Sequence, residues 1–399
     1  MSNWPTTGSV NLDALEASIA TQDASNAAQH AAQNLRLAQL EYVSHPPPEG
    51  LPPDPPPIDP PDPPPTGTLP IRADVPFPES IAPGATIADV RIHAAGRALV
   101  CPSGVTLRNV ELHDGYVLFE NATGLRVQDS LIIPNYGITQ YSGQPGGGDV
   151  GTGIMLALAS DISISNTIVA NGRSNIRGEG VSNVVIEDCF LYNPRGPMPR
   201  GQQVQFWSRG GTLNSNIRLS RVRGLVEWGV QAVDPFSEDQ FSMSAITSGG
   251  IIEDFQAEGG RSNSGTGVIV DAASQGITVR RGFIDSTGNA GLAWAGGDNH
   301  YVEDVLIVSD QEPSSNVGMY LWDFYGTTAD GKVSVTVGPN VSAYYTNRNG
   351  VANPLWVSGS GEMIGEMLAR RSFAEWNGVR PAKMPIPNVG WTPPVGSAA

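Results

Sequence analysis

The body of the chain repeats one short pattern of apolar and polar residues. In the stretch Val105-Thr-Leu107-Arg-Asn109, apolar residues alternate with polar ones until Asn109 ends the phrase. Related phrases begin at eight positions, namely 105, 125, 162, 184, 217, 250, 277 and 300. Alternation with a period of two predicts short, half-buried strands, and the spacing of 20 to 37 residues between copies predicts a solenoid with loops of variable length.

The fifth position of the phrase predicts a corner in each coil. It is Asn or Asp in six of the eight copies: Asn109, Asp129, Asn166, Asp188, Asp254 and Asp304. These two residue types tolerate the left-handed backbone region better than any others except Gly. We therefore expect the six side chains to form a line along one edge of the solenoid, with Asn166 and Asp188 one coil apart.

A second, weaker phrase precedes most copies of the first. It is a Gly followed by apolar residues, and it starts at Gly115, Gly153, Gly229, Gly267, Gly291 and Gly318. Each coil should therefore contain at least two strands and two corners. The pattern predicts an all-β solenoid of about nine or ten coils over residues 71–345.

The segments before the solenoid have a different composition. Residues 1–44 are rich in Ala, Leu and Gln, and Asp13 with Glu16 resembles a capping box, which predicts a helix over about 13–43. The apolar stripe of this helix is narrow, so the helix should pack against copies of itself or another protein; a frayed tail is the alternative. Residues 45–70 read as an extended proline-rich spacer, or alternatively as a docking site for a proline-binding module.

Residues 346–399 read as a C-terminal cap and tail. Within them, residues 362–378 predict one helix that ends at Gly378. Solenoids expose their terminal coils and need caps, and this helix is the candidate for that role.

Charge and composition exclude several classes of protein. The chain has 23 basic and 39 acidic residues, so its net charge of −16 disfavours nucleic-acid binding. Neither a signal peptide nor a long apolar run is apparent, so we expect no membrane insertion and no export by the usual secretion signal.

The two cysteines, Cys101 and Cys189, predict buried free thiols, and the five scattered histidines predict neither a metal site nor a cofactor. His300 occupies an apolar position of the repeat, which favours a core histidine.

The eight corner phrases resemble those of right-handed, single-stranded parallel β-helix proteins of the pectate-lyase-like type. A helical N-terminus, a rigid linker, a β-helix and a small cap together resemble bacteriophage tailspike or tail-fibre proteins. That resemblance implies a homotrimer on the virion surface, made in the host cytoplasm. It also implies that the N-terminal helix attaches to other virion proteins and that the β-helix meets polysaccharide of the host surface. Fold alone does not give function.

Acidic residues end the second phrase in four coils, at Glu120, Asp234, Asp271 and Asp323. Equivalent positions of successive coils stack, so these acids could line one side of the body. Asp234 and Asp271 are the first choice for a catalytic pair, because neighbouring coils lie ~4.8 Å apart and a retaining glycosidase needs carboxyl groups ~5 to 5.5 Å apart. The alternative is that the acids are solvated strand ends.

Aromatic and further acidic residues accompany these positions and are candidates for binding sugars. The aromatic candidates are Trp207, Trp228, Trp294, Tyr320 and Trp322. Flat rings can stack on sugar faces, although Trp294 and others could instead fill the solenoid interior. The insertion at 234–248 adds Glu238 and Asp239, and loops on a rigid scaffold commonly carry recognition.

Three hypotheses about function follow from the sequence. The first is a virion protein of the tailspike or tail-fibre kind that attaches to host polysaccharide, with or without depolymerase activity. The second is a free-standing carbohydrate-active lyase or glycosidase. The third is a structural head or baseplate decoration that binds no glycan.

Overall fold

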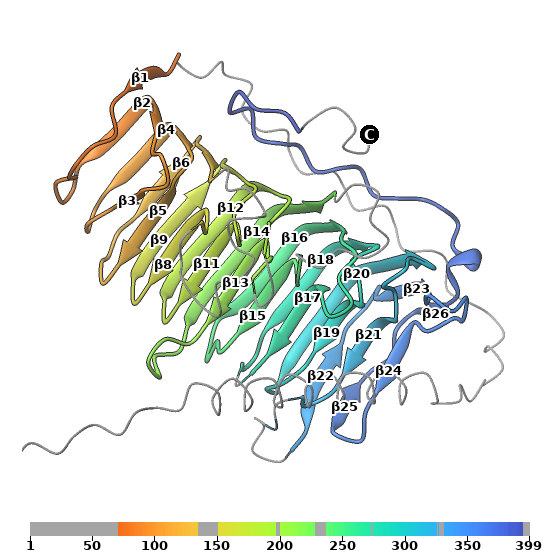
Figure 1. The fold of residues 1–399 in the computed structure, drawn as a ribbon. Helices are drawn as coiled ribbons and strands as arrows, with labels where there is room; N and C mark the ends of the chain where they lie inside the picture. Colours follow the sequence, from red (N-terminus) through yellow and green to blue (C-terminus); the bar gives the residue numbers. More distant parts are fainter. Residues whose placement is uncertain are drawn as a thin grey trace, which may run out of the picture. The chain divides into compact units, whose positions relative to one another are not determined.

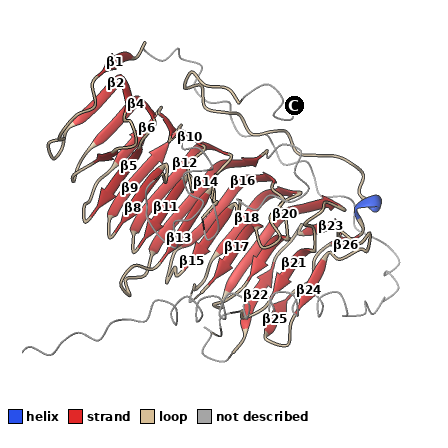
Figure 2. Cartoon of the chain, viewed as in Figure 1, coloured by secondary structure: helices blue, strands red, loops and turns tan. Residues whose placement is uncertain are grey.

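The chain was analysed as a computed structural model, which describes residues 71–134, 151–196, 200–227, 237–272, 274–324, 326 and 331–393. The predicted N-terminal helix and proline-rich spacer lie outside these ranges. The described residues form a stack of coils (Figure 1), and almost all of their regular structure is strand (Figure 2). No helix in these ranges is long and apolar enough to cross a membrane.

The coils build two sheets, and every pairing between their strands is parallel. The first sheet contains β1 (Ala73–Val75), β2 (Thr86–His93), β4 (Thr106–His113), β6 (Arg126–Gln128), β7 (Leu131–Ile133), β9 (Ser160–Ser165), β10 (Ile168–Ala170), β12 (Ser182–Tyr192), β14 (Ser215–Val226), β16 (Gly250–Gly259), β18 (Thr278–Asp285), β20 (His300–Asp310), β22 (Val333–Val337), β23 (Ser342–Thr346), β25 (Gly361–Ile364) and β26 (Ala369–Arg371). The second, ten-stranded sheet contains β3 (Ala98–Val100), β5 (Tyr116–Glu120), β8 (Ile154–Ala157), β11 (Ile176–Glu179), β13 (Val204–Trp207), β15 (Phe241–Ser244), β17 (Thr266–Asp271), β19 (Ala290–Trp294), β21 (Val317–Leu321) and β24 (Leu355–Val357). The chain is thus a right-handed, single-stranded parallel β-helix, as the sequence predicts.

The predicted corner residues are confirmed. All six adopt the left-handed region, with φ between 44° for Asn166 and 52° for Asn109 and Asp188. Asn166 and Asp188 lie one coil apart, because Ser165 pairs with Glu187. The two copies with Arg at this position, Arg221 and Arg281, bend in the same way, with φ of 53° and 49°.

Side chains at the corners bind one another in pairs along the stack. Asn166 donates to Asp129 at 2.6 Å, and Arg221 donates to Asp188 at 2.6 Å. The remaining pairs are Asn109 to Asp89, Arg281 to Asp254, and Asn340 to Asp304. Each corner Asp therefore accepts from the corner of the next coil, which fixes the register between coils. These ten corners of the described residues match the nine or ten coils expected over residues 71–345, and β25 with β26 adds a further coil.

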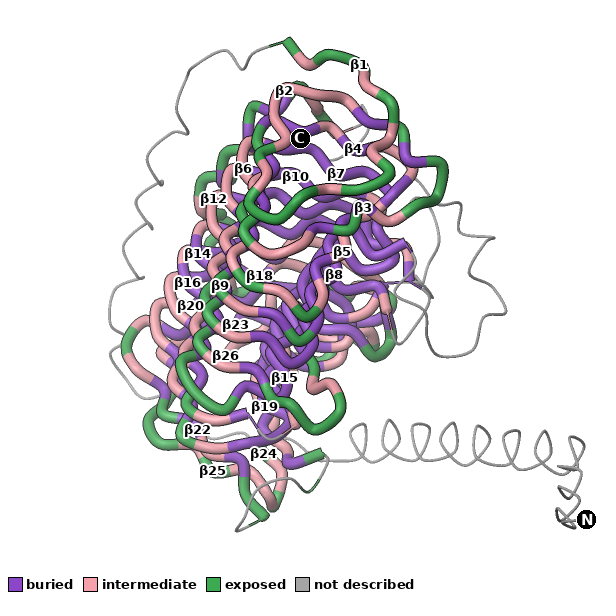
Figure 3. The backbone as a smooth tube through the Cα atoms, turned by 90° about the vertical axis from the view of Figure 1, so that its left-hand side faces the viewer, coloured by how far each residue is buried: buried purple, intermediate pink, exposed green. Residues whose placement is uncertain are grey.

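Each coil has three faces, two of which meet at the corner. We call the strand residues before the corner the pre-corner face and those after it the post-corner face; the ten-stranded sheet is the third. Exposed positions gather mostly at the turns between faces, and buried stretches follow the strands (Figure 3). Three buried amides hold the turn between the post-corner face and the ten-stranded sheet: Asn175 donates to the carbonyl of Tyr192, Gln203 to that of Leu225, and Gln240 to that of Glu258.

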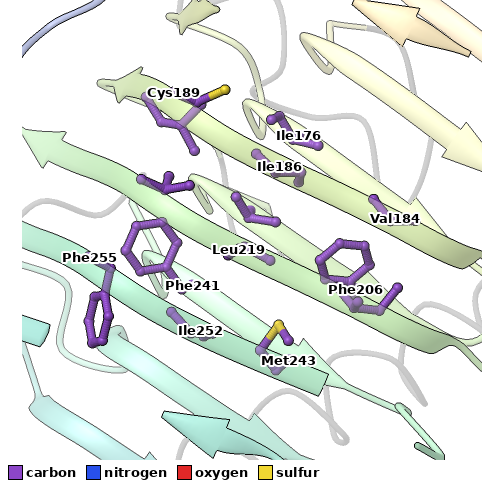
Figure 4. Packing of buried hydrophobic residues seen from close by; sticks show 14 of the residues in the cluster. Ile176, Val184, Ile186, Cys189, Phe206, Leu219, Phe241, Met243, Ile252 and Phe255 are labelled. Carbon is purple, nitrogen blue, oxygen red and sulfur yellow. The ribbon is translucent and has the colours of Figure 1, made fainter. Parts of the chain in front are cut away.

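Apolar side chains from all three faces fill the interior of the stack. Phe241 and Phe255 meet edge to face with ring centroids 6.0 Å apart (Figure 4). Cys101 and Cys189 are buried free thiols, as predicted, and burial raises the pKa of each to about 12. They belong to the core rather than to a reactive site.

His300 is a core histidine, as its apolar position in the repeat predicts. Its ring stacks on Trp294 at 5.1 Å between centroids. Nδ1 accepts the N–H of Ile277 at 3.2 Å, and Nε2 lies 3.0 Å from the carbonyl oxygen of Gly296. Burial lowers the pKa of His300 to about 4, so the ring is neutral at pH 7.

The predicted helix at 362–378 is wrong. Its residues form β25, β26 and a single 3₁₀ turn over Phe373–Glu375. Gly365, between the two strands, adopts a φ of 95°, which interrupts the helical pattern. β25 pairs with β22 and β26 pairs with β23, so both strands extend the sheet of the preceding coil. Hydrogen bonds to an existing sheet edge thus outweighed local helix propensity.

Residues 377–393, which we call the C-terminal strap, return along the outside of the post-corner face (Figure 1, dark blue). The strap covers an apolar cluster that includes Phe190, Tyr192 and Leu225, into which Val389 and Trp391 pack. Near its end, the carbonyl of Val389 accepts a 2.7 Å hydrogen bond from Arg72, close to the first strand. The strap therefore links the last described coils to the first.

Candidate functional site

Outward side chains of the ten-stranded sheet stack into two rows. The first outward row is Leu118, Met155, Arg177, Gln205, Ser242, Ile269, Ala293, Tyr320 and Trp356. The second outward row is Glu120, Ala157, Glu179, Trp207, Ser244 and Asp271. Their neighbours in each strand, such as Leu156 and Phe206, face the core. Successive members of a row come from successive coils, ~4.8 Å apart.

A network of charged and amide side chains covers the part of this face formed by β5, β11 and β13. Arg177 donates to Glu179 at 2.8 Å and to Gln205 at 2.7 Å. Arg209, in the loop after β13, reaches back to Glu120 at 2.7 Å and Glu179 at 3.2 Å. The two arginines and two glutamates compensate one another. Arg177, Glu179 and Gln205 are buried, whereas the side chains of Arg209 and Glu120 are about a third exposed and within reach of a ligand.

Trp207 stands at the edge of this network. Its side chain lies in the second outward row between Glu179 and Ser244, and 36% of its surface is exposed. An exposed indole on a strand beside polar groups is suited to binding a ligand that has both an apolar face and hydroxyl groups.

Three carboxyl groups lie on the next coils, Asp271 at the end of a strand and Asp239 and Glu238 before the start of one. Asp271, at the end of β17, is buried and accepts a hydrogen bond from the hydroxyl of Ser244. Asp239 accepts the backbone N–H and the hydroxyl of Thr266, each at 3.0 Å. Glu238 accepts the hydroxyl of Ser264 at 3.1 Å.

Burial keeps these carboxyl groups from ionising readily. Desolvation raises the pKa of Asp271 to about 8, and the charge of Asp239 adds to that rise. Desolvation also raises the pKa values of Glu238 and Asp239, and the charge of Asp239 raises that of Glu238 further. Asp271 can therefore hold a proton at pH 7, which is the state that a general acid needs.

The expected row of acids is only partly correct. Glu120 and Asp271 share the second outward row but lie five coils apart, whereas Asp323 falls beyond the end of β21. Asp234 lies outside the described residues. The strand of its coil that pairs with β17 is β15, so the residue equivalent to Asp271 is Ser244. The predicted strand equivalence of Asp234 and Asp271 is therefore wrong, because β15 lies within residues 234–248, which the sequence pattern predicted to be an insertion.

The aromatic predictions divide in a similar way. Trp294 is fully buried and faces the interior, so its predicted role in binding sugar is wrong and the alternative of a core residue is correct. Trp228 lies outside the described residues. Tyr320 projects outward in the first outward row, and Trp322 follows directly after β21.

The sequence patterns missed Arg177, Glu179, Gln205 and Arg209. Their strands, β11 and β13, do not begin with the Gly-initiated phrase. A usable signal was present, because Glu179 and Asp271 each precede the next corner phrase by five or six residues. No group of three or more His, Cys, Asp or Glu side chains that could hold a metal ion occurs within the described ranges.

No family model matches the chain, and no curated protein matches it. Among solved structures, the chain is similar to a mutant of the periplasmic alginate epimerase AlgG, at 10% identity and a TM-score of 0.45, over 73% of this chain and 83% of that one. It is also similar to the surface protein and adhesin PfbA of Streptococcus pneumoniae, at 10% identity and a TM-score of 0.43, over 72% and 80%. An alginate lyase from Paenibacillus sp. str. FPU-7 is similar at 15% identity and a TM-score of 0.42, over 72% and 93%.

Proposed function

We propose that this chain binds a polysaccharide on the outer face of the ten-stranded sheet, as a virion protein of the tailspike or tail-fibre kind. The observation that carries the proposal is the position of Trp207, exposed in one row with Glu179 and Asp271. A sugar ring can stack on the indole while its hydroxyl groups bind the partly exposed Arg209 and Glu120.

The fixed polar groups support this proposal. Arg177 and Glu179 hold each other in place, and Arg177 also orients the amide of Gln205. Preorganised donors and acceptors bind a ligand with little loss of conformational entropy.

A second candidate function, cleavage of the bound polymer, is favoured by Asp271. A carboxyl group whose pKa is raised to about 8 can donate a proton to a glycosidic oxygen. Asp239 does not serve as its partner carboxyl group, because it binds Thr266 at the opposite end of β17. The protein would then be a depolymerase as well as an adhesin.

Binding is tested on an array of purified bacterial capsular and lipopolysaccharide O-chain polymers. The wild-type chain should be retained by at least one polymer, and Trp207→Ala should weaken that retention about tenfold. Trp376→Ala is the matched control, because Trp376 lies on the post-corner face against Phe373 and Arg380. Equal loss in both variants, or no retention of the wild type, would contradict the proposal.

The proposed assembly is a homotrimer on the virion surface, attached to other virion proteins through residues 1–44. The proline-rich segment at 45–70 separates that attachment from the β-helix. Deleting residues 1–44 should leave a folded β-helix that no longer joins the particle. Mass measurement of the isolated protein should give three chains, and a monomer absent from particles would favour a free-standing enzyme instead.

A further inference from the structure

Four aromatic rings meet on the outside of the last two coils. Tyr320 and Trp356 are neighbours in the first outward row, with ring centroids 6.4 Å apart. Trp322 meets Trp356 edge to face at 5.8 Å and Phe324 at 4.9 Å. We call these four residues the aromatic platform.

The aromatic platform is not part of the core. Met319 and Leu321 alternate with Tyr320 along β21 and are the residues of this strand that fill the interior. Phe324 remains 39% exposed, and the other three rings are half-buried. Adjacent exposed apolar side chains of this size usually mark a binding surface rather than a packing requirement.

The aromatic platform is continuous with the proposed site. The first outward row runs from Gln205 through Ser242, Ile269 and Ala293 to Tyr320 and Trp356. Between the two ends, Ser242 and Ala293 are buried and Ile269 is half-buried, and none of the three carries a charge. Five coil steps separate Gln205 from Trp356, about 24 Å at one strand spacing per coil.

We propose that the aromatic platform is a second sugar-stacking site, which holds a distant part of the same polysaccharide chain. This inference rests on the proposed function. The apolar face of a pyranose ring carries C–H groups that suit the negative face of an aromatic ring. The polymer lies along the stack of coils, and its uncharged sugar faces contact the aromatic platform.

The test compares polymer length on the full chain. The probe is the array polymer that retains the wild type, cut into a short fraction of two or three sugars and a long fraction of more than eight. Trp356→Ala should weaken binding of the long fraction roughly threefold to tenfold, as expected for one lost stacking contact, and leave the short fraction unchanged. Trp356→Phe, which keeps a ring, should restore most of the loss.

Each outcome of the test has a separate meaning. If Trp207→Ala weakens both fractions and Trp356→Ala weakens neither, the aromatic platform does not bind the polymer and the proposed function stands. If the wild type is retained by no polymer, both proposals fail. If Trp356→Ala instead changes the sedimentation of the protein without any polymer, the rings are buried against a second copy, and the inference is overturned.

Discussion

The side chain of Gln256 holds the backbone of Met384 in place, although 128 residues separate them in sequence. The N–H of Met384 donates to Oε1 of Gln256 at 2.8 Å, and Nε2 donates to the carbonyl of Ala382 at 2.6 Å. The amide thus pairs with the C-terminal strap much as a neighbouring strand would. Met384 itself is buried, so its N–H has little access to water.

Gln256→Leu should therefore loosen the C-terminal strap. The leucine leaves the N–H of Met384 without its acceptor, at a cost of about 1–3 kcal/mol. Limited proteolysis near the exposed Val379 should accelerate about tenfold, because cleavage follows the population of the detached form. Asn388→Ala, at an exposed position of the same strap, should cleave at the wild-type rate, and equal rates in all three proteins would exclude this role for Gln256.

The corner at Asn166 gives a prediction about backbone strain. Asn166→Gly keeps the left-handed conformation and loses only the hydrogen bond to Asp129, about 1 kcal/mol. Asn166→Val also forces a β-branched side chain to a φ of 44°, which adds roughly 1–3 kcal/mol. The thermal unfolding temperature should be highest for the wild type, lower for Asn166→Gly and lowest for Asn166→Val. A Val variant as stable as the Gly variant would show that the corner carries no strain.

The raised pKa of Asp271 predicts how the stability of the protein depends on pH. Its folded pKa of about 8 lies above the unfolded value of about 4, so the native state binds more protons between these values. The stability that its neutral form contributes is complete below about pH 4 and disappears as the pH rises through 8. Asp271→Asn, which stays neutral, should flatten the fall in unfolding temperature between pH 5 and 8. An unchanged slope would mean that Asp271 ionises normally.

The lowered pKa of Glu253 predicts the opposite trend, a loss of stability in acid. Burial opposes its ionisation, but hydrogen bonds from Arg280, Arg218 and Arg281 outweigh burial and lower its pKa to about 2. Its contribution to stability is therefore complete above about pH 4.5 and is lost as the pH falls toward 2. Glu253→Gln should reduce the fall in unfolding temperature between about pH 4.5 and 2. It should leave the change in unfolding temperature between pH 5 and 8 as in the wild type, and measurements across both pH ranges check this.

Cleavage of the polymer gives a prediction for catalysis. Asp271→Asn cannot donate a proton, so it should reduce the release of reducing ends at least a hundredfold. Retention on the array polymer should change less than threefold, because the neutral amide has the size of the protonated acid. If Asp271→Asn loses retention together with cleavage, Asp271 acts in binding. If the wild type releases no reducing ends, the protein binds the polymer without cleaving it.

The sequence could predict the solenoid because its signals are local. A corner such as Asn109 requires a residue that tolerates positive φ, and the flanking strands require alternating apolar residues, so both constraints appear within five positions. The corners at Arg221 and Arg281 show the limit of that signal. There the acid of the preceding coil supplies a partner for the guanidinium, a contact between residues 27 or 33 positions apart.

The candidate site was harder to predict because it depends on register between coils. Asp234 and Asp271 occupy similar positions in the sequence phrase, yet the strand that pairs with β17 is β15, which places Ser244 opposite Asp271. Arg209 meets Glu120 across 89 residues, which no local pattern encodes. The predicted helix at 362–378 failed for the same reason, since the open edge of the preceding coil determined its structure.

Hydrogen exchange with and without the bound array polymer tests where the polymer binds on the β-helix. Binding on the outer face of the ten-stranded sheet should slow exchange in β11, β13, β15 and β17. Strands of the post-corner face, such as β10 under the C-terminal strap, should exchange as before. Protection confined to the post-corner face, with none in β13, would contradict the account.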